Sequence, residues 1–68
     1  NREHRNTAIY LLKKYTGLTN RQIGQLVGDI SYSAVAKVYQ RFSEKLKRDK
    51  ALRMEVGEIV SNLSNVKG

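Results

Sequence analysis

The sequence predicts an all-α fold, a small bundle of about four helices, on three observations. Apolar residues recur at spacings of three and four along most of the chain, and no stretch alternates apolar and polar residues with a period of two. Proline is absent, so nothing breaks these helical patterns from within. A chain of 68 residues is expected to form a single domain, residues 1–68, around one thin core.

A first helix is expected from about Glu3 to Tyr15, with Asn6 as an alternative N-cap that leaves its start open. Its apolar face is expected to contain residues spaced by four and three, with two apolar residues beside them: Ala8, Leu12 and Tyr15, flanked by Ile9 and Leu11. Gly17 follows this pattern and is expected in the left-handed conformation that often ends a helix.

A short second helix is expected between Thr19 and Gly28. Thr19 and Gln22, three residues later, match a capping box, and Leu18 with Ile23 would form the accompanying hydrophobic staple. The buried face would consist of three apolar residues, Ile23, Leu26 and Val27. Gly28 then stops the helix after barely two turns, so packing must stabilise it.

A third helix is expected from Ser31, a good N-cap residue, to about Arg48. One side carries an unbroken apolar stripe at helical spacing: Val35, Val38, Tyr39, Phe42 and Leu46. The opposite side is polar and mostly basic: Ser33, Lys37, Arg41, Glu44 and Arg48. This helix is therefore expected to bury one side and to expose a basic one.

A C-terminal helix is expected over about residues 49–63. Its apolar residues share one face: Leu52, Val56, Ile59, Val60 and Leu63. The dense charge run Lys45–Lys50 is expected to join the third and fourth helices, and the tail Ser64–Gly68 is expected to fray.

The composition excludes several classes of protein. Thirteen Lys and Arg against six Asp and Glu give a net charge of +7, which suits nucleic acid, an acidic lipid surface or an acidic protein. The absence of cysteine excludes disulfides, thiolate metal sites and a cysteine nucleophile. The longest apolar run, Ala8–Leu12, has five residues, too few for a membrane span or a signal peptide.

No catalytic constellation is present in the sequence. The single histidine, His4, lies near the terminus, and no spacing of ligands typical of a metal site occurs. The phosphate-binding pattern G-x-x-x-x-G-K-[ST] is also missing. We expect no enzyme activity, cofactor, metal or small-molecule substrate for this chain.

The short helix, glycine turn and longer helix over about residues 19–48 predict a helix-turn-helix. Gly24 would let the two helices approach, Gly28 would open the turn, and Val35 would lock the second helix against the first. The outer face of the second helix is polar, as contact with base edges requires: Tyr32, Ser33, Lys37 and Arg41.

The stretch TGLTNRQIGQLVG at residues 16–28 resembles a family pattern, T-x-x-S-L-P-E-I-G-x-x-F-G. That pattern is the scaffold helix of the C-terminal DNA-binding domain of the bacterial replication initiator DnaA. The family continues with G-R-D-H-T-T-V, where this chain has DISYSAV at residues 29–35. The resemblance covers about residues 5–48. It implies an all-α bundle with a lengthened helix-turn-helix, similar to the Trp repressor, that binds double-stranded DNA sequence-specifically.

The resemblance also implies residue roles. Residues matching base-reading positions, or facing DNA beside them, are Ser31, Tyr32, Ser33 and Lys37. Residues matching positions at the DNA backbone or the groove edges are Arg5, Asn6, Lys13, Asn20, Arg21, Ala34 and Arg41. Ser-Tyr-Ser-Ala replaces the family signature Asp-His-Thr-Thr for its nonamer site, so the resemblance does not supply the target sequence.

Residues 30–35, 42–52 and 63–68 also resemble the C-terminal tails of REP-associated tyrosine transposases, which carry a DnaA-like domain. The chain begins at Asn1 without methionine, and we expect it to be a piece of a longer protein, an initiator ATPase or a transposase. The expected location is the bacterial cytoplasm, at the nucleoid, with no membrane partner. The alternative is a basic module that binds an acidic protein or a membrane surface without reading bases.

Overall fold

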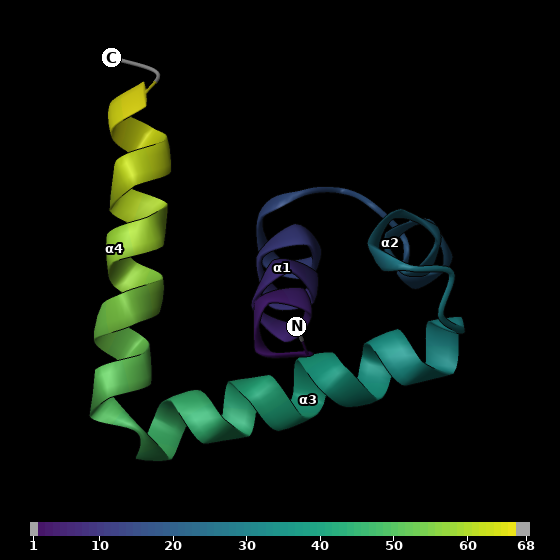
Figure 1. The fold of residues 1–68 in the computed structure, drawn as a ribbon, viewed down its shortest axis with the longest axis horizontal. Helices are drawn as coiled ribbons and strands as arrows, with labels where there is room; N and C mark the ends of the chain where they lie inside the picture. Colours follow the sequence, from purple (N-terminus) through teal and green to yellow (C-terminus); the bar gives the residue numbers. More distant parts are fainter. Residues whose placement is uncertain (1, 67–68) are drawn as a thin grey trace.

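The computed structural model describes residues 2–66, which form four helices and no strand (Figure 1). The helices are α1 (Arg2–Tyr15), α2 (Asn20–Val27), α3 (Tyr32–Arg48) and α4 (Lys50–Val66). The radius of gyration is 12.1 Å. The prediction of a small all-α bundle is confirmed. Among the described residues, no helix combines the length and apolarity that crossing a membrane requires.

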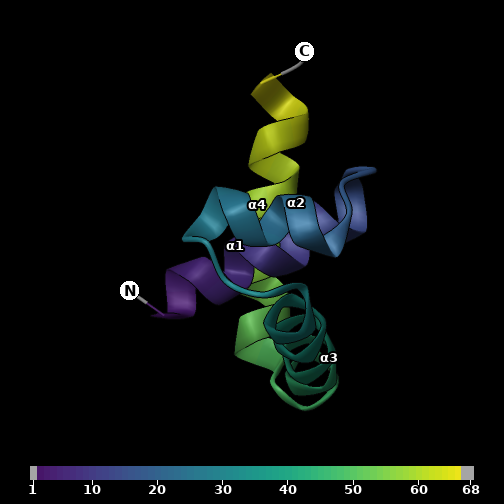
Figure 2. The ribbon, with the colours of Figure 1, turned by 90° about the vertical axis from the view of Figure 1, so that its right-hand side faces the viewer.

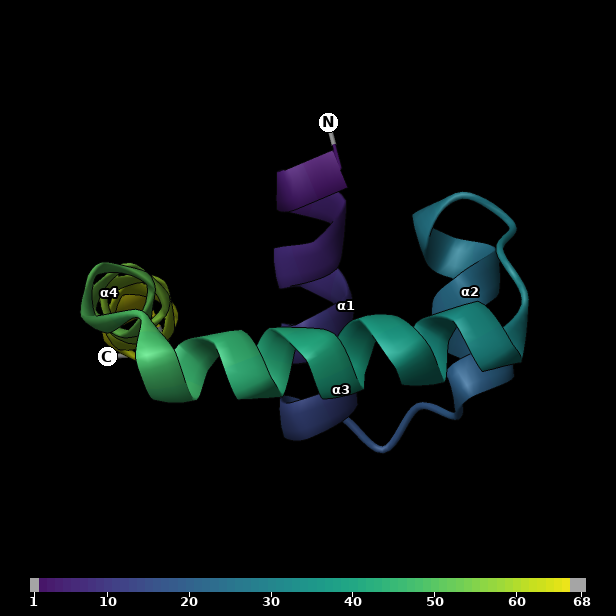
Figure 3. The ribbon, with the colours of Figure 1, turned by 90° about the horizontal axis from the view of Figure 1, so that it is seen from below.

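Helix α3 is the centre of the arrangement. It lies across α1 and α2, which pack against each other and against the same side of α3 (Figure 3). Helix α4 turns away at the C-terminal end of α3 and packs mainly on α3 (Figure 1). The side of α3 that faces away from α1 and α2 is left uncovered along its length (Figure 3).

Helix α1 has nearly the predicted bounds, but its most buried residues are Ile9, which was predicted to flank the apolar face, and Tyr10, which was not predicted on it. Ile9 is fully buried in a cluster with Ile23 and Val35, and Tyr10 is buried in a second cluster with Phe42 and Val56. Two neighbouring positions are buried because α1 meets α2 and α3 on one side and the α3–α4 corner on the other. Tyr15, predicted on the apolar face, is 58% exposed at the end of the helix, so that prediction is wrong.

The end of α1 also differs from the prediction. Positive φ angles among the described residues occur only at Gly28 and Asp29, so Gly17 is not left-handed. The hydroxyl of Thr16 donates to the carbonyl of Leu12, and the Thr16 amide donates to the same oxygen at 3.1 Å. Because Thr16 satisfies this carbonyl, the helix ends without a glycine cap.

Helix α2 begins with the predicted capping box. The Gln22 amide donates to Thr19 Oγ1 at 3.2 Å, and the Thr19 amide donates to Gln22 Oε1 at 2.9 Å. Leu26, predicted in the buried face, is 67% exposed. It points about 100° away from its neighbour Val27, and an eight-residue helix against two neighbours buries only the narrower face around Ile23.

Removing this cap should destabilise the whole domain, because the short helix α2 forms one wall of the core. We expect Thr19→Ala to lower the free energy of unfolding by about 1 kcal/mol. Urea unfolding followed by circular dichroism measures the change. Thr19→Ser keeps an accepting hydroxyl and serves as the control. Equal losses for the two variants would show that the cap does not stabilise α2.

The turn between α2 and α3 depends on two positive φ angles, 136° at Gly28 and 60° at Asp29. It brings the chain back over α2, where the Ile30 amide donates to the Gly24 carbonyl at 3.1 Å. A Cβ atom at Gly24 would lie 2.2 Å from the Ile30 carbonyl oxygen and 3.5 Å from a Val35 methyl. The predicted need for a small residue is confirmed, although the closest group is the turn and not the axis of α3.

Helix α3 keeps its predicted N-cap and apolar stripe. The Ala34 amide donates to Ser31 Oγ at 3.1 Å, and Val35 and Phe42 are buried. The charge run Lys45–Lys50 was predicted to be a connection, but helix continues through most of it, because lysine and arginine are good helix formers. Only Asp49 separates α3 from α4.

Helix α4 continues to Val66, three residues beyond its predicted end; residues 67–68 lie outside the described part. Its packed residues are Leu52, Val56 and Val60. Leu63 was predicted on the same buried face but is 60% exposed. It lies beyond the last residue of α4 that packs on the Tyr10 cluster.

Candidate nucleic-acid interface

The uncovered side of α3 presents the predicted base-reading residues. Ser31, Tyr32 and Ser33 are exposed at the N-terminal end of α3, and Lys37 is exposed one turn further on. Tyr32 is 60% exposed. The apolar stripe faces α1 and α2, so Ser33 and Lys37 point away from the core by helical geometry. Tyr32 lies three residues before Val35, at the edge of the stripe, and borders residues of α1 and α2.

Two residues at this end also serve the helix itself. The Ser31 hydroxyl oxygen accepts the Ala34 amide, so Ser31 has a structural role as the N-cap beside its predicted contact with bases. Ala34 is half-buried, and its amide is engaged in this bond. Ala34 therefore has no free amide with which to make its predicted contact with the DNA backbone.

The residues of α1 that are predicted to contact the DNA backbone lie on both sides of α3. It crosses α3, so that its N-terminal end projects on one side and its C-terminal end on the other (Figures 2 and 3). Arg5 and Asn6 lie near the first end and Lys13 near the second. The helical rise between Arg5 and Lys13 is about 12 Å, close to the width of the DNA major groove.

One surface depression gathers four predicted residues from three helices. Lys13 of α1, Asn20 and Arg21 of α2, and Tyr32 of α3 line it together with Thr19. Two of these residues are cations, and none of the lining residues is acidic. The first amides of α2, which lack helical partners, emerge at the same place and add positive potential. This depression is suited to an anion such as a phosphate.

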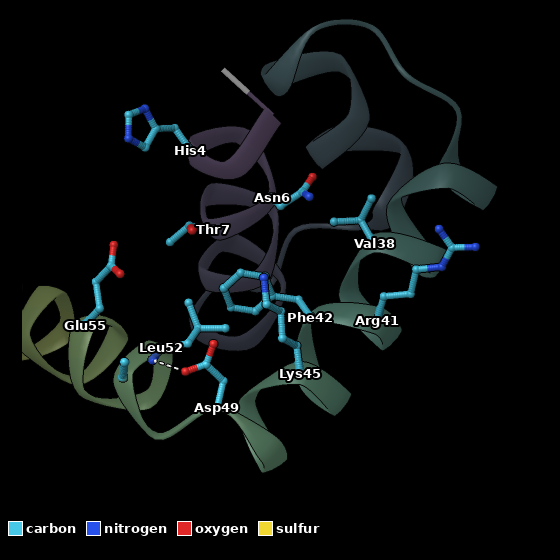
Figure 4. Close-up of a pocket in the computed structure, with 11 residues that line it drawn as sticks. His4, Asn6, Thr7, Val38, Arg41, Phe42, Lys45, Asp49, Leu52 and Glu55 are labelled. Atoms are coloured by element: carbon cyan, nitrogen blue, oxygen red, sulfur yellow. Dashed lines mark hydrogen bonds between the residues drawn. The ribbon is translucent and has the colours of Figure 1, made fainter.

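A second hollow, of about 400 Å³, lies between the start of α1, the middle of α3 and the start of α4 (Figure 4). Asn6 and Arg41 line it, which separates them from the four residues of the depression above. Its charges are mixed, because Lys45 stands with Asp49 and Glu55. Among the described residues, no group of three His, Cys, Asp or Glu side chains could hold a metal ion.

Unpaired polar atoms occur at predicted contact residues. In the described part of the chain, three buried side-chain atoms lack a hydrogen-bond partner: Arg5 Nε, Asn6 Oδ1 and Asn20 Oδ1. All three belong to residues assigned to the DNA backbone or the groove edges. These three atoms are buried, so they are places where polar groups are unpaired inside the fold and are not themselves open to a partner.

Not every cation near the interface is free. Lys14 Nζ donates to the Tyr10 hydroxyl at 3.2 Å and lies 5.6 Å from the centre of that ring. This hydrogen bond raises the pKa of Lys14 above its ordinary value. The Lys14 ammonium is therefore held against the core aromatic residue Tyr10.

Gln40 is exposed on the outward face of α3 and was not among the predicted site residues. Gln40 lies seven residues after Ser33 and three residues after Lys37, so the helical spacing of polar residues opposite the apolar stripe could have identified it. A glutamine amide can form two hydrogen bonds with adenine in the major groove.

No protein-family model matches the chain, and no solved structure gives a significant match. The class of the protein is therefore defined by its own geometry. It is an all-α protein with a short helix, a tight turn and a long helix whose uncovered side is polar and mainly basic.

Proposed function

We propose that this chain is a sequence-specific double-stranded DNA-binding module in which α3 enters the major groove. The observation that carries the proposal is the convergence of Lys13, Asn20, Arg21 and Tyr32 from three helices in one depression beside the start of α3. Lysine and arginine neutralise phosphates, and asparagine and tyrosine are common donors to phosphate oxygens. A phosphate bound there would hold α3 in register on the duplex.

The flanking geometry supports the same proposal. With α3 in the groove, Lys13 and Arg21 would meet phosphates on one side, and Arg5 and Asn6 on the other. Arg41 would contact the backbone further along α3. Base reading would be left to Ser33 and Lys37 on the outward face, with Tyr32 and Ser31 at the edge of the groove.

The resemblance to the DnaA C-terminal domain favours one of two biological settings. The module would serve replication initiation, or it would be the DNA-binding tail of a transposase. Either setting lies in the bacterial cytoplasm, at the nucleoid. In both, the activity of this chain is binding, and any catalysis would belong to other parts of the parent protein.

Selection from a random duplex pool tests the proposal most directly. We expect a defined motif to be enriched, and we expect log K to fall against log salt with a slope of about −5 for six phosphate contacts. Binding to anionic vesicles or to all duplexes alike, with no enriched motif, would instead support a basic interaction module.

The double variant Lys13→Ala/Arg21→Ala tests the depression itself. We expect it to reduce the salt slope by about two and to weaken binding to all duplexes similarly, because two phosphate contacts are lost. Arg48→Ala/Lys50→Ala removes the same charges from exposed positions at the α3–α4 corner and is the control. Fluorescence anisotropy across a salt series measures both. Equal changes in slope would contradict a specific role for the depression.

A further inference from the structure

The single residue between α3 and α4 adopts a non-helical conformation. Asp49 has φ −113° and ψ 100°, while helical hydrogen bonding continues on both sides of it. The Asp49 amide donates to the Lys45 carbonyl at 2.9 Å, and the Arg53 amide donates to the Asp49 carbonyl at 3.1 Å. Rotation of one residue into the helical region would therefore join α3 and α4 into one helix.

The hydrogen bonds of the bend correspond to those of a straight helix. A continuous helix would pair the amides of residues 50–52 with the carbonyls of residues 46–48. In the bent form, Arg53 Nη1 donates to the first two of these carbonyls, at 2.7 and 3.0 Å. Asp49 Oδ1 accepts the third of these amides, at 3.0 Å. The side chains of Asp49 and Arg53 thus satisfy three of the six backbone groups that a straight helix would pair here, and in this way they hold the bend.

The periodic pattern of mostly apolar residues along α3 continues through the bend into α4. Nine positions follow one another at alternating spacings of four and three: Val35, Tyr39, Phe42, Leu46, Asp49, Arg53, Val56, Val60 and Leu63. Seven of the nine are apolar. In a straight helix all nine would share one face. The two polar positions, Asp49 and Arg53, lie at the middle of the stripe, where the chain bends.

Straightening would also separate α4 from its own core. Leu52, Val56 and Val60 would leave the cluster of Tyr10 and Phe42, which would become exposed. The surface that fits this cluster is the apolar face of α4, so the α4 of a second straightened copy would pack on it. Short hinges between packed elements favour such an exchange.

We propose that Asp49 is a hinge through which two copies of this chain form a dimer by exchanging α4. In this dimer, each α4 packs on the Tyr10–Phe42 cluster of the other copy. The same contacts close the core in both forms, and only the hinge conformation differs. This inference does not depend on DNA binding.

The substitution Asp49→Ala tests the hinge. It removes the cap that holds the bend and adds a strong helix former. Because each dimer straightens two hinges, we expect the dimer dissociation constant to fall on the order of thirtyfold. Sedimentation equilibrium over a concentration series measures it. Asp49→Asn keeps a capping side chain and is expected to stay close to the parent chain. Unchanged association of Asp49→Ala, or equal association of both variants, would overturn the proposal.

A distance measurement distinguishes exchange from simple side-by-side pairing. The chain has no cysteine, so Lys37→Cys and Asn62→Cys place two spin labels at exposed sites on α3 and α4. In the straight helix their Cα atoms would be about 38 Å apart. The bend shortens this separation, because the two helices meet at an angle (Figure 1). Labelled Asp49→Ala diluted into unlabelled Asp49→Ala is expected to show the longer distance within one chain. The separation of the parent monomer in that dimer would overturn the exchange.

Discussion

Gly24→Ala is expected to lower the free energy of unfolding by about 3 kcal/mol, near the upper end of overpacking effects. The added Cβ would lie 2.2 Å from the Ile30 carbonyl oxygen and 3.3 Å from its carbon. Both are backbone atoms, so no side-chain rotation can relieve the contact. The turn would have to move away from α2, which would strain the hydrogen bond from the Ile30 amide to the Gly24 carbonyl.

Gly57→Ala is the matched control for this prediction. Gly57 lies inside α4, and a Cβ there would meet nothing within 4 Å. The same substitution is therefore expected to stabilise the protein by up to about 1 kcal/mol, because alanine favours helix over glycine. Urea unfolding of both variants, followed by circular dichroism, compares them. A stabilising effect of Gly24→Ala would contradict the close approach between the turn and α2.

The double variant Ser33→Ala/Lys37→Ala is expected to weaken binding to the selected duplex by about 2–5 kcal/mol, since each lost base contact costs about 1–3 kcal/mol. Both side chains point outward from α3 and have no role in its core. The loss is expected to fall mainly on the preferred sequence, so that preferred and random duplexes would bind with more similar affinity.

The same helix provides the control. Ser43 and Lys47 repeat the serine–lysine spacing ten residues further along α3, toward its C-terminal end. Ser43→Ala/Lys47→Ala makes the same chemical change where base contact is not proposed. Isothermal titration with preferred and random duplexes compares the two variants. Equal losses on both duplexes for both variants would indicate that α3 contributes only charge.

The features of this protein that depend on short stretches of chain follow the sequence prediction closely. The capping box at Thr19, the N-cap at Ser31 and the stripe of α3 are all observed as predicted. Each depends on residues within one or two turns of one helix. Caps and periodicity are properties of the chain over such short distances, so a single sequence contains them.

The wrong predictions share a different cause. Leu26 and Tyr15 belong to apolar patterns, yet both are exposed, because α2 and the end of α1 lack a neighbour on those sides. Ile9 and Tyr10 are both buried, because α1 is covered on two sides. The junction near Asp49 was placed correctly within the charge run, but its reduction to one residue was not predicted. Each outcome depends on where another helix lies.

For the candidate site too, the sequence predicted one part, and only the tertiary structure decided the other. The sequence alone determined the four-helix class, the N-caps of α2 and α3 and the exposed polar face of α3, because these follow from local hydrogen bonding and from the period of 3.6 residues. Only the tertiary structure brought Lys13, Asn20, Arg21 and Tyr32 into one depression and placed the two ends of α1 on opposite sides of α3. These placements depend on how the helices cross, and the crossing is decided by core packing among residues far apart in the chain. The charge of +7 was visible from the start, but packing decided which cations share one surface.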